Sequence, residues 1–590
     1  MTRKTRPGLT HWQKQALADL RQVSAEQPDV LRLVGAPAHG RDGSLLVRLR
    51  LHTGPLATGA DGGLALQEHE DFVVTLPGSP LPMPTIEVTH PRFTGYPHVL
   101  AGRRLCVFLD PAREWDPLRG GMRALLSRLW AWLADAAAGQ FDASQAMYHA
   151  VGGVLHHTPG TPTLVVRAPG PDRRIQAGYL ITRTKHRLDL VYGPPPQGGG
   201  LRVPVVSLAA ALPLGGGTTL AELMAHLDGR GPASAQGRPV RAAVSPQSPA
   251  ILTTLATSAI RNPDNTHQYL ILAVPHPVGG PPHLLGARLP APAADALRHA
   301  VRAQGAALNI DVSRIRPDLP IEWCPVSDER PAVTTRRDQG TPISGFLGKH
   351  VQVWGCGGIG SWMAEFAVRA GAAQVSVCDP GTVTGGLLVR QNYTEGDVGA
   401  PKAQALAQRL QAISDTVVVD AHDGAVPDNA ADLTGTDVLI DATVTIAMGH
   451  VLDQFAAVEG PRPVLAQVAT DTRTGTLGLL SVCAPGTAHG PSSIDTAAGK
   501  TVLADPALEL YHSLWQATLG GDELVPTRGC SVPTFHGSSA DLAAVAGTLT
   551  SLLGMHLVAP ASGTHLVALP HAAGSPHHRF LPHDLPPAVP

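Results

Sequence analysis

The residues HVQVWGCGGIGSWMAEFAVRAGAAQVSVCD, from His350 to Asp379, decide the fold of the second half of this chain. An apolar, β-rich run leads into a turn that contains four glycines, Gly355, Gly357, Gly358 and Gly360. Helix-compatible residues follow from 361 to 370, and a second apolar run ends at Asp379. This order of strand, glycine turn, helix, strand and acid is typical of a Rossmann-like nucleotide-binding fold.

The glycines and the acid each suit a part of a nucleotide. Glycine lets backbone amides approach a phosphate at the N-terminus of the following helix, where the helix dipole favours an anion. Asp379 follows Gly355 by 24 residues (379 − 355 = 24), which suits hydrogen bonds to ribose hydroxyls. A nicotinamide dehydrogenase would show the same pattern, so these residues alone leave the reaction open.

Two cations after the second strand favour another chemistry. Arg390 precedes Gln391, and Lys402 lies in the run DVGAPKA. A hydride-transfer enzyme has no need for cations there, whereas an enzyme that stabilises charge building on a triphosphate does. We therefore expect a reaction at the phosphates of a nucleoside triphosphate.

With these motifs, residues 340 to 560 resemble the ThiF/MoeB/ubiquitin-activating adenylation family. Its members show GxGGxG, a ribose-binding Asp, N-x-x-R-Q and G-x-x-K-A in this order. The resemblance implies ATP and Mg²⁺ as cofactors and a homodimer as the working form. It also implies that Arg390 and Lys402 contact the ATP phosphates while the C-terminal carboxylate of a partner attacks the α-phosphate. The implied nucleotide-binding residues are Gly355, Gly357, Gly358, Gly360, Asp379, Arg390, Gln391, Lys402 and Asp441.

The chain departs from this family at two places. Leu387 stands where the family has the Asn of N-x-x-R-Q, and DATVT at 441–445 stands where it has D-x-T-D-N. Only Asp441 remains of the two acids. Either Asp441 takes over the metal, or magnesium rests on phosphates and water, as it often does. A domain that binds nucleotide without catalysis is the further alternative.

The first 150 residues resemble a second family, the ubiquitin-conjugating enzymes. Along the chain, a helix expected at 9–27 is followed by short strand-like runs, Cys106, a Trp115-Asp-Pro117 motif and a helix expected at 118–138. The resemblance implies that Cys106 is the acceptor thiol. His98 lies eight residues before it (106 − 98 = 8), in the place of the family Asn, and would hydrogen-bond the oxyanion. The alternative is a buried cysteine in a strand. Trp115 is expected to anchor the core or a loop.

A second thiol, Cys530, lies in the glycine- and proline-marked run TRGCSVPTF. It resembles the acceptor cysteine that ubiquitin-activating enzymes carry after the nucleotide fold, and Arg528 would favour its thiolate. The alternative is an ordinary loop cysteine. Upstream, Arg336 and Arg337 either reach a γ-phosphate, as an arginine does in the family, or form a solvated charge pair. The remaining cysteines, 324, 356, 378 and 483, are expected to be structural.

Bulk composition limits the other possibilities. A length of 590 residues predicts several domains, and a net charge of −2 gives no case for binding nucleic acid. The first residues, MTRKTRPGLTHWQKQ, carry charge without an apolar core, so we expect no secretory signal there. We also expect no membrane span, since no run approaches the roughly 18 consecutive apolar residues that one needs. Six scattered cysteines without a CxxC pair argue for reduced thiols in a cytoplasm and against structural zinc.

We therefore predict an α/β protein with four regions. These are a ubiquitin-conjugating-like α+β domain at 1–150, an α/β linker domain at 151–335, a Rossmann-like adenylation domain at 336–558 and a mobile Pro/His-rich tail at 559–590. The layout resembles bacterial fused ubiquitin-activating and ubiquitin-conjugating proteins, the best known of which sit in CBASS antiviral operons.

The resemblance implies adenylation of the C-terminus of a ubiquitin-like protein or a nucleotidyltransferase. A thioester at Cys530, transfer to Cys106 and attack by a target lysine would follow. Two alternatives stay open: a degenerate nucleotide-binding scaffold, and an enzyme that activates a sulfur carrier.

Overall fold

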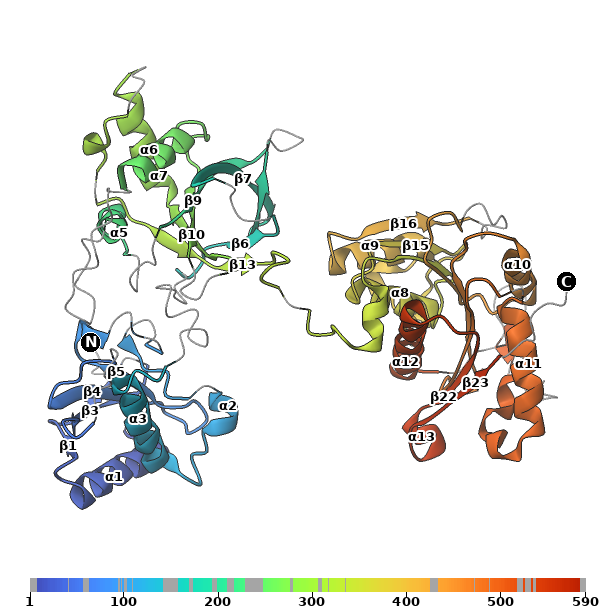
Figure 1. Cartoon of the computed structure of the whole chain (residues 1–590), viewed down its shortest axis with the longest axis horizontal. Helices are drawn as coiled ribbons and strands as arrows, with labels where there is room; N and C mark the ends of the chain where they lie inside the picture. Colours follow the sequence, from blue (N-terminus) through green and yellow to red (C-terminus); the bar gives the residue numbers. More distant parts are fainter. Residues whose placement is uncertain are drawn as a thin grey trace. The chain divides into compact units, whose positions relative to one another are not determined.

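The computed structural model describes residues 8–583, except 41, 57–62, 94–95, 97, 100–102, 109, 142–157, 169–172, 194–198, 210–216, 229–247, 276–279, 306–309, 317, 335, 425–432, 472, 488, 517–523, 526–531 and 534–536. Contacts divide the chain into two compact units, residues 1–335 and 336–590 (Figure 1).

Unit 1 begins with a small antiparallel sheet that two helices accompany. The strands pair in the order β1-β3-β4-β5, and β2 pairs with β3. The capping box of Thr10 and Gln13 starts the first helix. A buried apolar cluster joins the sheet to α1 and α3. The elements are α1 (His11–Glu26), β1 (Leu31–Leu33), β2 (Ala38–His39), β3 (Leu45–His52), β4 (His69–Leu76), β5 (Thr85–Val88), η1 (Pro91–Phe93), α2 (Pro111–Glu114) and α3 (Gly121–Ala137).

The rest of unit 1 forms a mixed eight-stranded sheet, in the order β12-β11-β10-β9-β7-β8-β6-β13. An apolar cluster packs its three helices against this sheet, so this part of the chain has a mixed α/β fold. The elements are β6 (Thr163–Val166), β7 (Ile175–Thr184), β8 (Arg187–Tyr192), β9 (Leu201–Ser207), α5 (Leu220–Leu227), α6 (Ser248–Ala259), β10 (Gln268–Val274), β11 (His283–Leu289), α7 (Ala291–Arg302), η3 (Val312–Arg314), β12 (Glu322–Cys324) and β13 (Val326–Asp328).

Unit 2 is built on an eight-stranded sheet, in the order β16-β15-β14-β17-β18-β19-β22-β23. The first five strands in this order are parallel, and the last three pair antiparallel. The strands are β14 (His350–Trp354), β15 (Gln374–Cys378), β16 (Val418–His422), β17 (Val438–Asp441), β18 (Val464–Thr470), β19 (Leu477–Cys483), β22 (Gly563–Ala568) and β23 (His577–Pro582), and a separate hairpin joins β20 (Leu524–Val525) to β21 (Val532–Pro533).

Helices cover both faces of this sheet. Helices α8, α9 and α12 pack on one face, and α10 and α11 pack on the other (Figure 1). The helices are η4 (Pro342–Phe346), α8 (Gly360–Arg369), η5 (Gly385–Leu387), η6 (Glu395–Asp397), α9 (Lys402–Ile413), α10 (Ile446–Ala457), α11 (Pro491–Ala504), η8 (Pro506–Leu514), α12 (Ser539–Val558) and α13 (Pro570–Ala573). The predicted Rossmann-like α/β architecture is therefore present.

The strand order locates the site. From β14 the chain proceeds to β15 and β16 on one side, and it then returns to place β17 on the other side. The carboxyl ends of β14 and β17 therefore flank a topological switch point, where ligands bind in open α/β sheets.

The predicted mobile tail is wrong for residues 563–583. Strand β22 is buried and pairs with β19, and β23 pairs with β22 at the sheet edge. The apolar run HLVAL at 565–569 buries surface against the sheet in spite of the Pro- and His-rich composition around it.

Among the described residues, α12 alone is long and apolar enough to cross a membrane by length and composition. Its Leu542, Val545, Leu549 and Leu553 are fully buried in the apolar cluster shared with α8 and the sheet. That packing accounts for the apolar composition of the helix.

Candidate nucleotide site

The glycine turn between β14 and α8 is shaped by close contacts that exclude side chains. Gly355 has φ +86, and a Cβ there would lie 2.8 Å from the carbonyl carbon of Ala442. A Cβ at Gly360 would lie 1.9 Å from the carbonyl oxygen of Gly355. At Gly357, by contrast, a Cβ would meet no atom within 4 Å. The turn is therefore tight against the protein and open at Gly357, as a phosphate cradle requires.

Asp379 lies at the end of β15 and joins two loops. Its Oδ2 accepts a hydrogen bond from the backbone N–H of Cys356 at 2.8 Å, and its Oδ1 accepts one from the N–H of Gly381 at 2.7 Å. Burial, followed by the Asp379 charge, raises the pKa of the Cys356 thiol well above its usual range. Cys356 is therefore an unreactive packing residue, as expected.

Lys402 brings a positive charge to the same place. It is the first residue of α9, and its N–H donates to the carbonyl oxygen of Gly381 at 2.9 Å. A Cβ at Gly381 would lie 3.3 Å from Lys402 Nζ and 2.8 Å from Asp379 Oδ1. The ammonium group, the carboxylate and the glycine turn are therefore neighbours, which brings together three features that the sequence separates by up to 47 residues (402 − 355 = 47).

Arg390 and Gln391 lie in the loop after β15, which passes the start of α8. A Cβ at Gly358 would be 3.8 Å from the carbonyl oxygen of Arg390. The Gln391 side chain is buried, and its Oε1 has no hydrogen-bond partner among the described residues. A buried acceptor without a partner costs free energy, so a further donor is expected there. A donor from a bound nucleotide suits it.

Three residues that sequence reasoning missed hold this loop. The Tyr393 hydroxyl donates to the carbonyl oxygen of Cys356 at 2.8 Å. Asn392 Nδ2 donates to Glu365 Oε2 at 2.6 Å, and Glu365 also pairs with Arg409 at 2.7 Å. These bonds fasten the Arg390–Gln391 loop to α8 and to the glycine turn. The adjacent Gln-Asn-Tyr in the sequence was the available signal, but it names no partner.

Asp441 ends β17 at the switch point, and its carboxyl group is fully buried. Oδ1 accepts from the N–H of Thr443 at 2.9 Å and from its hydroxyl at 2.7 Å, and Oδ2 accepts from Gln467 Nε2 at 3.1 Å. Burial raises the pKa of this carboxyl group. A magnesium ion with its water shell needs an accessible carboxylate, so Asp441 as it stands does not fit the predicted metal role.

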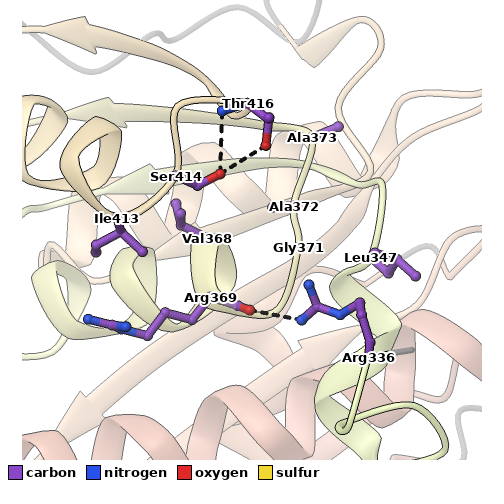
Figure 2. Close-up of a pocket in the computed structure, with 10 residues that line it drawn as sticks. All are labelled: Arg336, Leu347, Val368, Arg369, Gly371, Ala372, Ala373, Ile413, Ser414 and Thr416. Carbon is purple, nitrogen blue, oxygen red and sulfur yellow. Dashed lines mark hydrogen bonds between the residues drawn. The ribbon is translucent and has the colours of Figure 1, made fainter. Parts of the chain in front are cut away.

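Arg336 lies at the opposite end of α8 from the glycine turn. It donates to the carbonyl oxygen of Arg369 at 2.8 Å (Figure 2). It also forms an ion pair with Asp338. A ten-residue helix is about 15 Å long, so Arg336 does not reach the glycine turn of its own chain. It instead borders a pocket of about 520 Å³ between the ends of α8 and α9.

Cys106 is partly exposed, whereas the other four cysteines of the described residues are buried. Its thiol donates to the carbonyl oxygen of Phe108 at 3.3 Å, and its N–H donates to the carbonyl oxygen of His98 at 2.8 Å. Burial, followed by the charge of Glu114, raises the pKa of this thiol. The predicted site cysteine is thus reachable but held as a neutral thiol.

His98 has φ +62, a left-handed conformation that Asn, Asp and His tolerate better than other residues. Its ring is buried and lies edge-on to Phe141. Burial lowers the pKa of this imidazole, which favours the neutral ring. Trp115 is the predicted anchor, since it is buried and its Nε1 donates to the carbonyl oxygen of Pro80 at 3.0 Å. Cys530 lies outside the described residues.

Residues 346–561 match the model of the ThiF family, and residues 200–329 match the model of the Cap2 central linker domain. A tRNA threonylcarbamoyladenosine dehydratase of Escherichia coli (strain K12) is 28% identical over 163 residues, which are 27% of this chain and 56% of that protein. A sulfur carrier protein adenylyltransferase of Thermus thermophilus is 34% identical over 113 residues, 19% of this chain and 42% of that protein. The chain spans about half the length of these relatives.

Two solved structures are similar at low identity. The crystal structure of PaaA has 16% identity, a TM-score of 0.29 and covers 41% of this chain and 66% of that one. The structure of E. coli MccB with ATP has 12% identity, a TM-score of 0.29 and the same coverage. By the two family matches, the chain contains a ThiF-family adenylation domain that follows a Cap2 central linker domain.

Proposed function

We propose that unit 2 uses ATP to adenylate the C-terminal carboxylate of a protein partner. The observation that carries this proposal is the meeting of Lys402, Asp379 and the open glycine turn at the switch point of a ThiF-family fold. Asp379 suits the ribose, the amides around Gly357 suit the phosphates, and Lys402 and Arg390 supply positive charge. Gln391 Oε1 would accept a hydrogen bond from a donor group of the nucleotide.

In the proposed reaction, a carboxylate oxygen of the partner attacks the α-phosphorus of ATP and pyrophosphate leaves. Negative charge builds on the phosphate oxygens during this step. Fixed cations and backbone N–H groups stabilise such charge most effectively, because they need not reorient. Lys402 at the start of α9 and the glycine turn at the start of α8 are fixed in this way.

We extend the proposal to conjugation. The Cys530 thiolate would displace AMP from the acyl-adenylate, and the Cys106 thiolate would then displace the Cys530 thiolate. A target lysine amine would finally displace Cys106 and lose one proton. The partial exposure of Cys106 supports this role, since the other four cysteines in the described part of the chain are buried. We expect the partner to be a ubiquitin-like protein or a nucleotidyltransferase, as in CBASS conjugation systems, and the site of action to be the cytoplasm.

ATP–pyrophosphate exchange tests the adenylation step. We predict exchange that depends on a partner protein encoded beside this gene and that falls by about 10- to 100-fold in Lys402→Ala, because charged hydrogen bonds contribute about 1.5–3 kcal/mol. Lys500→Ala, an exposed lysine on α11, is the matched control and is expected to leave exchange unchanged. Equal exchange in wild type and Lys402→Ala would contradict the assignment.

A sulfur-carrier-activating adenylyltransferase is the second candidate. The Thermus thermophilus relative, a sulfur carrier protein adenylyltransferase, favours it. This candidate differs from the thioester relay in the role of unit 1, because sulfur-carrier activation assigns no step to Cys106. A Cys106→Ser variant that retains the full partner-dependent activity of wild type would favour this candidate over the thioester relay.

A degenerate nucleotide-binding scaffold is the third. This candidate is favoured by three replacements of polar family residues, at Leu387, Val444 and His98. Tight ATP binding without exchange in the presence of every neighbouring partner would support the scaffold and exclude adenylation.

A further inference from the structure

We propose that Asp441 is a positioning residue of the nucleotide site and not a ligand of magnesium. Magnesium that arrives with ATP is then held by the nucleotide phosphates and water. This inference rests on the nucleotide site of the proposed function, but it concerns ATP binding and is independent of the partner and of the two thiols.

The Asp441 carboxylate is not accessible to a hydrated magnesium ion. Asp441 has no exposed surface, and three hydrogen bonds from Thr443 and Gln467 occupy its two oxygens. Magnesium demands a near-octahedral shell with ligands at about 2.0–2.1 Å and usually keeps several waters. A buried carboxylate that already serves three donors offers no such position. Rotation of the side chain toward a metal would leave the partly buried Thr443 N–H without its acceptor.

The run DATVT at 441–445 contains Asp441 as its one acid. Position 444 carries Val444, with φ +57 and an exposed fraction of 66%. Both oxygens of Asp379, the carboxylate that follows β15, accept hydrogen bonds from backbone N–H groups. Among the described residues no group of three or more His, Cys, Asp or Glu side chains could hold a metal. The site therefore has the Lys402 ammonium group beside the glycine turn, and the Asp379 and Asp441 carboxylates are already engaged in hydrogen bonds.

Asp441 holds the backbone segment that packs against the glycine turn. The Ala442 N–H donates to the carbonyl oxygen of Trp354 at 2.8 Å, and the Asp441 carboxylate fixes Thr443. Gly355 packs against the backbone of these two residues, because a Cβ there would lie 2.8 Å from Ala442 and 2.9 Å from Thr443. The Ala442–Thr443 backbone is thus the wall of the glycine turn. Asp441 keeps that wall in place and so shapes the phosphate cradle indirectly.

Two substitutions separate positioning from ligation. In Asp441→Asn the amide oxygen still accepts from Thr443, and the Gln467 amide can turn to accept from the new NH₂. A neutral amide is a much weaker magnesium ligand than a carboxylate. Asp441→Ala removes all three hydrogen bonds. Asp437→Asn is the matched control, because Asp437 precedes the other end of β17, where it bonds Lys349 and the His350 N–H.

The experiment is calorimetric titration of the full-length protein with ATP, once in EDTA and once with excess magnesium. We expect Asp441→Asn and Asp437→Asn to match wild type within about twofold under both conditions. We expect Asp441→Ala to lose about tenfold or more in both, because the Ala442–Thr443 backbone that packs against Gly355 is no longer held in place.

A selective loss would overturn the proposal. If Asp441→Asn kept its affinity for metal-free ATP but lost tenfold or more for magnesium-ATP, Asp441 would be a ligand. Wild-type protein that bound no ATP would overturn both this inference and the proposed function. Normal ATP binding without pyrophosphate exchange would overturn the proposed function alone.

Discussion

At the scale of single residues, Tyr393 shows how the nucleotide site is held together. Its hydroxyl lies 2.8 Å from the carbonyl oxygen of Cys356 and 3.3 Å from that of Lys402. One buried side chain thus joins the glycine turn, the loop that carries Arg390 and the start of α9. Burial raises the pKa of this phenol, so it stays protonated and keeps its donor.

The glycines of the turn separate stability from binding. A Cβ at Gly360 would collide with the Gly355 carbonyl oxygen at 1.9 Å, whereas a Cβ at Gly357 would enter open space. We predict that Gly360→Ala lowers the melting temperature, and that Gly357→Ala keeps it but weakens ATP binding by about tenfold or more, since the methyl group lies where a phosphate approaches. Thermal unfolding and calorimetric titration measure the two effects. A Gly357→Ala protein that binds ATP like wild type would place the phosphates elsewhere.

The sequence predicted part of this site and could not predict the rest. The glycine turn, Asp379 and Lys402 form local patterns whose spacing carries information. The bond between Tyr393 and Cys356 joins residues 37 apart, and it depends on how the loop returns over α8. Asp441 illustrates the opposite limit, because its sequence position suggested a metal while its burial and hydrogen bonds, visible only in the fold, argue against one.

At the scale of elements, three histidines link α12, β22 and β23. His565 Nε2 lies 2.7 Å from His556 Nε2, and His565 Nδ1 lies 2.9 Å from His578 Nε2. A neutral imidazole has one donor and one acceptor, so His565 can donate to one neighbour and accept from the other. A second proton would place a charge in the buried interface.

This chain of histidines predicts acid sensitivity of unit 2. Burial, followed by the two neighbouring histidines, lowers the pKa of His565 to about 3, from an ordinary value near 6.5. The folded state thus binds fewer protons than the unfolded state between these values. The stability that unit 2 has while His565 is neutral is present in full above pH 6.5, and it is lost as the pH falls toward 3. At pH 5 the loss is about 2 kcal/mol.

Melting temperatures of wild type and His565→Gln between pH 7 and 5 measure this contribution. We expect a smaller decrease with acid in His565→Gln than in wild type. His512→Gln, which removes a histidine that bonds only backbone carbonyl oxygens, should keep the wild-type slope. An unchanged slope in His565→Gln would show that His565 titrates normally in the folded protein.

The elements also show why the tail prediction was wrong. Composition around residues 559–590 is dominated by Pro and His, which indicated a mobile segment. The two strands within it, β22 and β23, are defined by pairing with β19 and with each other, over sequence separations that composition does not report. The N-terminal helix and the helix after Trp115 were predicted closely, because their apolar periodicity is local.

At the scale of the whole molecule, the chain combines two units with separate chemistry. Unit 2 carries the ThiF-family domain with the proposed nucleotide site, and unit 1 carries Cys106 and the Cap2 central linker domain. The proposed relay requires both units in one pathway. Covalent linkage would raise the effective concentration of one thiol for the other to the order of mM for a flexible tether.

A non-reducing gel of the full-length protein with ATP, magnesium and a ubiquitin-like or nucleotidyltransferase protein from neighbouring genes tests this relay most directly. Wild type, Cys530→Ser and Cys106→Ser run side by side. The account predicts a thiol-sensitive adduct on wild type, no adduct on Cys530→Ser, and an adduct confined to Cys530 in Cys106→Ser. An adduct on Cys106 in the Cys530→Ser protein, or none on wild type that carries out partner-dependent pyrophosphate exchange, would contradict the relay.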